Sequence, residues 1–143
     1  MKLTRINPGD LKGKKKEAYN FQKVSGILAD FGYQTIKLAD DWSGADFIAQ
    51  HLDGSFLLVQ LKGRLTVKDD YRGKELWICF PDCVADRVDW YLCPHDVLLD
   101  CLIKKKKSIE GTMSWSTDGG YNIGYVTKEL SGMLQDYKIP TNA

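Results

Sequence analysis

The stretch that decides the fold runs from Gly44 to Arg64 and reads GADFIAQHLDGSFLLVQLKGR. It contains two short apolar runs, Ala45–His51 and Phe56–Leu61, which are separated by Leu52–Ser55. The Asp53-Gly54 pair inside this spacer favours a tight turn, because glycine adopts positive φ without a Cβ clash. The stretch therefore predicts a β-hairpin with two half-buried or buried strands.

Three polar side chains interrupt this apolar hairpin near one end. Asp46 belongs to the first strand, and Gln60 and Lys62 belong to the second strand and its end. Residues two apart on a strand point to the same face, so we expect Gln60 and Lys62 to lie on one side of the sheet with Asp46 nearby. Burying such groups is costly unless they have partners or a function.

The rest of the composition indicates one ordinary globular domain. The chain has 143 residues and a formal net charge of +1, so it carries no overall attraction for a polyanion. The polar N-terminus is unlike a signal peptide, and no apolar run is long enough to span a bilayer, so we expect a cytoplasmic protein without membrane contact. A zinc site built from Cys79, Cys83, Cys93 and His95 is an alternative, although the paired Cys-x-x-Cys spacing of zinc knuckles is missing.

Periodicity predicts a helix at about 11–31, in which Phe21, Val24, Leu28 and Phe31 form an apolar stripe and which Asp10 caps. A strand is expected at 33–38, a loop at 40–44, the hairpin, and then a polar, turn-rich segment at 63–73. Further expected elements are strands at 76–80 (stopped by Pro81), 88–93, 112–115 and 121–126, a helix at 95–103 continued by a lysine-rich turn at 104–107, and a closing helix at about 127–137. The sequence predicts an α/β (α+β) fold in which one domain, residues 1–143, has a central mixed β-sheet flanked by helices.

The polar residues of the hairpin suit phosphodiester hydrolysis. Carboxylate and amide oxygens are ligands for Mg²⁺ or Mn²⁺, and one or two carboxylates suffice where substrate phosphate and water complete the shell. A bound ion activates water and neutralises phosphate charge, and a lysine beside it can orient the water or stabilise the developing charge. Glu17 lies one turn before Phe21 and is interpreted in two ways, as a first-turn acid favoured by the helix dipole or as a carboxylate that faces the sheet.

Asp46, the Gln60-Leu61-Lys62 segment and a preceding helix with Glu17 together resemble the PD-(D/E)xK nuclease superfamily of restriction-endonuclease-like proteins. Within this superfamily, the pattern of motif residues most resembles that of Holliday-junction-resolvase-like and intron homing endonuclease members. The resemblance covers about residues 11–103 and implies an αβββαβ core, followed here by C-terminal strands and a helix at about 112–138. It also implies that Asp46, Gln60 and Glu17 hold Mg²⁺ or Mn²⁺ and that Lys62 is the catalytic lysine.

The sequence departs from the superfamily pattern at Gln60, where an acid is usual. At about 4 Å and an effective dielectric constant of about 20, two unit charges interact by roughly 4 kcal/mol, so the missing charge should weaken metal binding. The amide oxygen can still coordinate, and Glu17 can supply charge. The competing interpretation of Gln60 and Lys62 is a strand end that emerges into solvent.

Basic residues flank the proposed site on both sides in sequence, which predicts a phosphate-binding face. Tyr71 and Arg72 are expected to reach a nucleic-acid groove or, alternatively, to cover the sheet edge. His95 is expected to be a cap or a satisfied core histidine rather than a ligand. The expected nucleic-acid-binding residues are Lys12, Lys14, Lys15, Lys16, Arg64, Lys68, Tyr71 and Arg72.

The function expected from these features is a metal-dependent endonuclease that cuts DNA, duplex or branched, as a homodimer or higher homo-oligomer. A DNA-binding or assembly module that keeps the fold without activity is the alternative, and a nuclease that acts on RNA is a third possibility.

Overall fold

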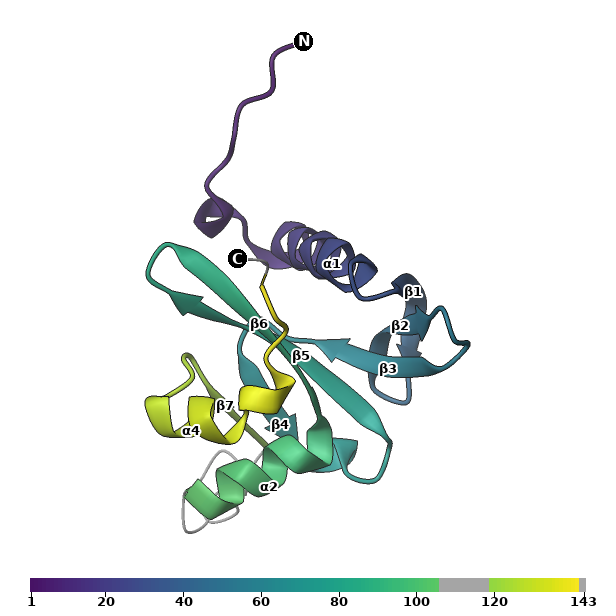
Figure 1. Cartoon of the computed structure of the whole chain (residues 1–143), viewed down its shortest axis with the longest axis vertical. Helices are drawn as coiled ribbons and strands as arrows, with labels where there is room; N and C mark the ends of the chain where they lie inside the picture. Colours follow the sequence, from purple (N-terminus) through teal and green to yellow (C-terminus); the bar gives the residue numbers. More distant parts are fainter. Residues whose placement is uncertain (106–118, 142–143) are drawn as a thin grey trace.

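The structure is a computed structural model that describes residues 1–105 and 119–141 (Figure 1). The helices are α1 (Gly13–Ala29), α2 (His95–Lys105) and α4 (Lys128–Met133), with short 3₁₀ turns η1 (Pro8–Asp10), η2 (Asp69–Tyr71) and η4 (Gln135–Tyr137). The strands are β1 (Tyr33–Trp42), β2 (Ala45–His51), β3 (Phe56–Leu61), β4 (Leu65–Lys68), β5 (Leu76–Val84), β6 (Arg87–Pro94) and β7 (Gly120–Ile123).

The predicted hairpin is present with the predicted bounds, as β2 and β3. Its turn is closed by hydrogen bonds from the His51 N–H to the Ser55 carbonyl and from the Gly54 N–H to the His51 carbonyl. Gly54 has φ 90°, the left-handed conformation that glycine adopts without strain. The antiparallel register pairs Phe47 with Val59, which fixes the positions of all side chains further along both strands.

Five strands form one mixed sheet in the order β1-β2-β3-β5-β6. All neighbours are antiparallel except β3 and β5, which run parallel. Strands β4 and β7 form a separate antiparallel pair. The predicted fold class is confirmed: the described residues form a single α+β domain with a central mixed sheet and flanking helices.

The two faces of the sheet bury separate apolar clusters. Helix α1 covers one face through Val24 and Leu28, which pack with Phe47 and Val59 of the hairpin. The other face is covered by α2, α4 and the β4–β7 pair, so the sheet lies between helices on both sides (Figure 1). No helix among the described residues is long and apolar enough to cross a membrane.

The N-terminal helix differs from the expectation at both ends. Lys12, not Asp10, occupies the N-cap position, because Asp10 ends the short turn η1. The helix ends at Ala29, and a positive φ at Gly32 turns the chain into β1. Phe31 therefore lies beyond the helix and is 40 % exposed rather than part of the apolar stripe.

Three strand expectations are corrected. Strand β1 continues through most of the expected 40–44 loop to Trp42, after a register shift against β2. The 63–73 segment contains β4 and η2, whose short length hides their periodicity. Pro81 does not end β5. The Cys79 carbonyl accepts from the Lys62 N–H on the β3 side, and the backbone nitrogen of Pro81, two residues further on, points to that same side. Since β3 has ended by the level of Pro81, the missing proline N–H breaks no ladder bond.

The helix expected at 95–103 is present as α2 and follows β6, as the order of the predicted elements required. The αβββαβ order implied by the resemblance is not found, because β4 and η2 stand between the third strand and β5 where that order has a helix. At the C-terminal end, β7 ends at Ile123 and α4 at Met133, so both are shorter than expected. The expected 112–115 strand and the last two lysines of the 104–107 turn lie outside the described residues.

Candidate functional site

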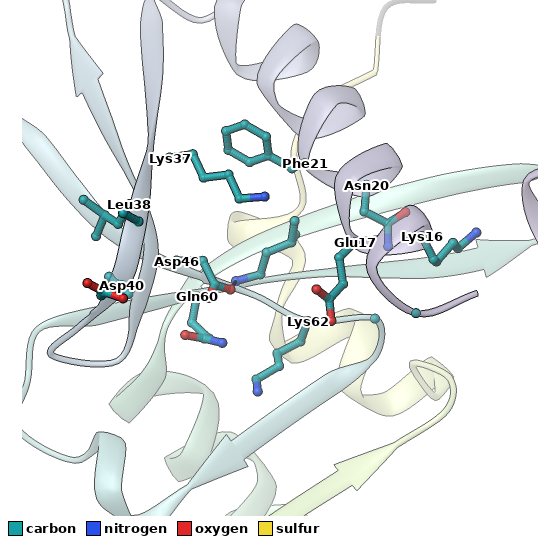
Figure 2. A pocket seen from close by; sticks show the side chains of 15 residues that line it. Lys16, Glu17, Asn20, Phe21, Lys37, Leu38, Asp40, Asp46, Gln60 and Lys62 are labelled. Carbon is teal, nitrogen blue, oxygen red and sulfur yellow. Dashed lines mark hydrogen bonds between the residues drawn. The ribbon is translucent and has the colours of Figure 1, made fainter. Parts of the chain in front are cut away.

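Asp46 and Gln60 face one another across the β2–β3 hairpin. The last paired residues of β2 and β3 at this end are Phe47 and Val59, and Asp46 and Gln60 are the next residue beyond them on each strand. Residues directly opposite on antiparallel strands have neighbouring side chains on the same face of the sheet. Figure 2 shows the Gln60 amide beside the Asp46 carboxylate.

Asp46 is held in place by the neighbouring strand. Its Oδ2 accepts a hydrogen bond of 2.9 Å from the backbone N–H of Leu61. The pairing of β2 and β3 ends before these residues. The Asp46 carboxylate therefore accepts the Leu61 N–H where the backbone ladder between the two strands has stopped. The carboxylate is thereby oriented before any ligand arrives.

Gln60 carries an unusual polar atom. Only 9 % of the residue is exposed, and its Oε1 is buried without a hydrogen-bond partner among residues 1–105 and 119–141. A buried, unpaired amide oxygen costs about 1–3 kcal/mol, and such groups are uncommon in folded proteins. The oxygen therefore fits a position that is completed by a ligand which donates to it or coordinates it.

These residues line a cleft of about 510 Å³ between the end of the hairpin and the first turns of α1 (Figure 2). Glu17 is exposed and reaches the cleft from α1, so it faces the sheet as the second interpretation of this residue expected. Lys62 follows β3 directly, and its backbone N–H is bonded to the Cys79 carbonyl at 2.8 Å. The structure thus brings the four expected residues together in one cleft: Glu17, Asp46, Gln60 and Lys62.

The donor set matches a hard divalent cation. The cleft offers oxygen atoms of Asp46, Gln60 and Glu17, which are ligands for Mg²⁺ or Mn²⁺. Within residues 1–105 and 119–141, no three His, Cys, Asp or Glu side chains gather around a possible ion. The expected ligands supply two carboxylates, Asp46 and Glu17, and one amide, Gln60. Mg²⁺ is commonly held by one or two carboxylates with water and phosphate.

Sequence reasoning missed three residues on the walls of the cleft. Asn20 lies one turn beyond Glu17 on the same face of α1, and only 9 % of it is exposed. Lys37 reaches the cleft from β1 and lies over the Phe21 ring, 5.5 Å from its centroid. Asp40 lies where β1 shifts register against β2, a bulge that the sequence pattern does not reveal. For Asn20, the three-residue spacing from Glu17 was an available signal.

The expected nucleic-acid-binding residues divide into two groups. The first group lies at the N-terminus of α1: Lys12, Lys14 and Lys15 are exposed, and Lys16 lines the cleft and donates through Nζ to the Pro8 carbonyl. Arg64, exposed next to the cleft residue Gly63, bonds the Asn122 side chain. Of these basic residues Lys16 lines the cleft, Lys15 lines a separate pocket on α1, and the others are close to cleft residues in sequence.

The second group, Lys68, Tyr71 and Arg72, lies in and after β4. Tyr71 is 9 % exposed and packs in the core, so its ring covers the sheet instead of reaching a groove. Arg72 is exposed but pairs with Asp69 at 2.9 Å. Lys68 is half-buried, and its Nζ lies 5.9 Å from the Tyr71 ring centroid.

His95 is a satisfied core histidine, as expected. It is 1 % exposed, its Nε2 accepts from the Lys68 N–H at 3.1 Å, and its Nδ1–H donates to Asp96 Oδ1 at 2.9 Å. Burial lowers the pKa of His95, which the neighbouring Asp96 only partly opposes. Both ring nitrogens are occupied, so neither is available to the alternative zinc site in this arrangement. Cys79 and Cys93 are buried free thiols, and burial raises the pKa of Cys93 to about 12.

Comparison with known proteins adds nothing to this geometry. No family model matches the chain, and no curated protein or solved structure is significantly similar to it.

Proposed function

We propose that the protein is a metal-dependent endonuclease that hydrolyses phosphodiester bonds in DNA. The observation that carries the proposal is the unpartnered, buried Oε1 of Gln60 opposite Asp46, in a cleft that also contains Glu17 and Lys62. Such an oxygen beside a carboxylate is unfavourable in an empty structural site and is satisfied by a cation.

Each expected site residue of the cleft has a distinct role in the proposed hydrolysis. Asp46, Gln60 and Glu17 would hold Mg²⁺ or Mn²⁺, which when bound lowers the pKa of water and neutralises charge on the phosphate. The Lys62 ammonium orients the attacking water or donates to the negative charge that develops on the phosphate oxygens. Water oxygen bonds to phosphorus, one P–O ester bond breaks, and the departing sugar oxygen receives a proton.

Exposed basic residues near the cleft residues in sequence support a nucleic-acid substrate. Lys12, Lys14 and Lys15 are exposed around the start of α1, and Arg64 follows the cleft residue Gly63. Each duplex phosphate that such residues neutralise adds about 0.9 to the magnitude of the salt slope of binding. One cleft cuts one strand, so cleavage of both strands of a duplex would use two copies of the chain as a homodimer.

A cleavage assay with plasmid, linear duplex, single-stranded, four-way-junction and RNA substrates tests the proposal. Cutting is expected with Mg²⁺ or Mn²⁺ and not with EDTA. Lys62→Met should abolish it, whereas Lys128→Met, a matched change at an exposed residue of α4, should not. Metal-independent cutting, or equal cutting by Lys62→Met and the parent, contradicts the assigned site. Cleavage of RNA alone replaces the DNA substrate in the proposal.

The second candidate is a DNA-binding or assembly module without activity. Gln60 favours it, because a neutral amide replaces a charge that would strengthen a divalent site. Gln60→Glu separates the two candidates in calorimetric Mg²⁺ titrations of the intact protein. The enzyme is expected to bind Mg²⁺ with Gln60 in place, whereas the module is expected to bind it only after the change to Glu.

A further inference from the structure

The Tyr71 ring lies beside two lysine side chains. The Nζ atoms of Lys62 and Lys68 are each 5.9 Å from the centroid of the ring. An ammonium group at this distance from an aromatic face is attracted by the ring quadrupole. Lys62 is the expected catalytic lysine, so a core aromatic residue contacts the charged end of a group that the proposed reaction uses.

The ring itself is fixed by its neighbours. It meets the His95 ring edge to face, with the centroids 5.5 Å apart and the planes at 84°. On another side Gly44 approaches so closely that a Cβ there would lie 3.3 Å from two ring carbons. Since Gly44 is two residues before Asp46, the ring also contacts the hairpin segment that leads to the proposed metal site.

The backbone on both sides of Tyr71 is tied to the first turn of α2. The Lys68 N–H donates to His95 Nε2, and the Gly73 N–H donates to Asp96 Oδ2, both at 3.1 Å. The two acceptors are linked by the His95–Asp96 hydrogen bond of 2.9 Å. Residues 68–73 are therefore clamped at both ends.

A lysine side chain has four rotatable bonds and samples many rotamers when it is free. The Lys62 backbone is fixed to β5, and its ammonium lies over Tyr71, so both ends of this side chain are restrained. Figure 2 shows that the side chain extends on the same side as the Gln60 amide and away from the Glu17 carboxylate. The ring thus selects the direction in which the ammonium leaves the strand.

We infer that Tyr71, which the His95–Asp96 pair holds in place, is a positioning residue for Lys62. Its ring keeps the Lys62 ammonium on the side of the cleft where the Gln60 amide lies. The catalytic part of this inference rests on the proposed nuclease function. The contact between ring and ammonium does not, and it is measurable in the protein without metal or substrate.

The test uses NMR of the full chain after reductive ¹³C-methylation, which labels lysine amines and keeps their charge. The Lys62 and Lys68 resonances are assigned by their loss in Lys62→Arg and Lys68→Arg. In the parent and in Tyr71→Phe, both should lie upfield of the exposed Lys128, because a ring shields them. Tyr71→Leu, which keeps apolar bulk but has no ring, should move both to the position of Lys128. Unchanged Lys62 resonances in a folded Tyr71→Leu protein would overturn the inference.

Single-turnover cleavage provides the second readout. Tyr71→Leu should lower the single-turnover rate constant about two- to fivefold with little change in the half-saturating concentration, and Tyr71→Phe should restore the rate constant. If the parent cuts and Tyr71→Leu loses the NMR shift without losing rate, the positioning role is wrong while the nuclease proposal stands. If the parent cuts no substrate but the shift behaves as expected, the nuclease proposal fails and the contact remains.

Discussion

Asp46 of β2 is bonded through its Oδ2 to the backbone N–H of Leu61 at the end of β3, over a distance of 2.9 Å. This contact joins the carboxylate of the proposed metal site to the backbone between Gln60 and Lys62. The same side chain therefore has a structural and a chemical role, and two substitutions separate them.

Asp46→Asn removes the charge and keeps an oxygen that accepts from the Leu61 N–H. We expect a free energy of unfolding close to that of the parent, and loss of metal affinity by about a hundredfold or more, since one unit charge at about 4 Å contributes roughly 4 kcal/mol. Asp46→Ala should lose the same affinity and also about 1.5–3 kcal/mol of stability, because the hydrogen bond to the carboxylate is gone. Urea unfolding in EDTA and calorimetric Mg²⁺ titration measure the two effects. Equal stability of the Asn and Ala variants would show that the Leu61 contact contributes nothing.

Gln60→Met removes the unpaired buried oxygen while it keeps the length of the side chain. In EDTA this variant should be more stable than the parent by about 1–2 kcal/mol, because a buried acceptor without a partner is lost. Added Mg²⁺ should raise the unfolding midpoint of the parent and leave that of the variant unchanged, since only a ligand that binds the native state stabilises it. A variant that is clearly less stable than the parent in EDTA would mean that the amide oxygen is satisfied.

The hairpin was predictable because its signals are local. Two short apolar runs and an Asp-Gly turn specify β2 and β3, and the two-residue period of a strand gives Gln60 and Lys62 a shared face. The grouping of Asp46 with Gln60 follows from the register, which a tight turn largely fixes. These features depend on residues that are near one another in the chain.

The parts that were not predicted depend on distant contacts. Pro81 continues β5 only because β3 has already ended beside it, and no pattern around Pro81 shows where a neighbouring strand stops. Tyr71 has polar neighbours in sequence, yet it is buried by Gly44, His95 and other residues far away in the chain. The polar sequence context left two alternatives open for Tyr71, a groove contact and a cover for the sheet edge, and the buried ring agrees with the second.

Gly44→Ala tests how closely the hairpin packs on Tyr71. Gly44 has φ 88°, and an added Cβ would lie 3.2–3.3 Å from Leu76 and Tyr71. The matched control is Gly54→Ala, where φ is 90° and nothing lies within 4 Å of the new Cβ. Both should lose about 1–3 kcal/mol through backbone strain, and Gly44→Ala should lose more because it also displaces the ring. Its Lys62 methyl resonance should shift, and that of Gly54→Ala should not. Equal losses with equal spectra would show that the approach to Tyr71 has no energetic effect.

His95 should make stability depend on pH below neutrality. Burial lowers the pKa of its imidazole from the ordinary value of 6.5, Arg72 adds to this lowering, and Asp96 and Asp69 oppose it without reversing it. As the pH falls below about 6.5, the unfolded chain therefore binds this proton before the folded chain does. The contribution of neutral His95 is complete above that pH and is lost as the pH falls from about 6.5 towards the folded-state pKa.

The measurement is the urea unfolding free energy between pH 7.5 and pH 5.5, a range in which exposed carboxylates stay ionised. The parent should lose up to about 1.4 kcal/mol per pH unit below pH 6.5. His95→Gln should have a flatter profile, because an amide oxygen can accept from the Lys68 N–H without titrating. A parent slope that His95→Gln leaves unchanged would contradict the assignment and would place the titrating group elsewhere in the fold.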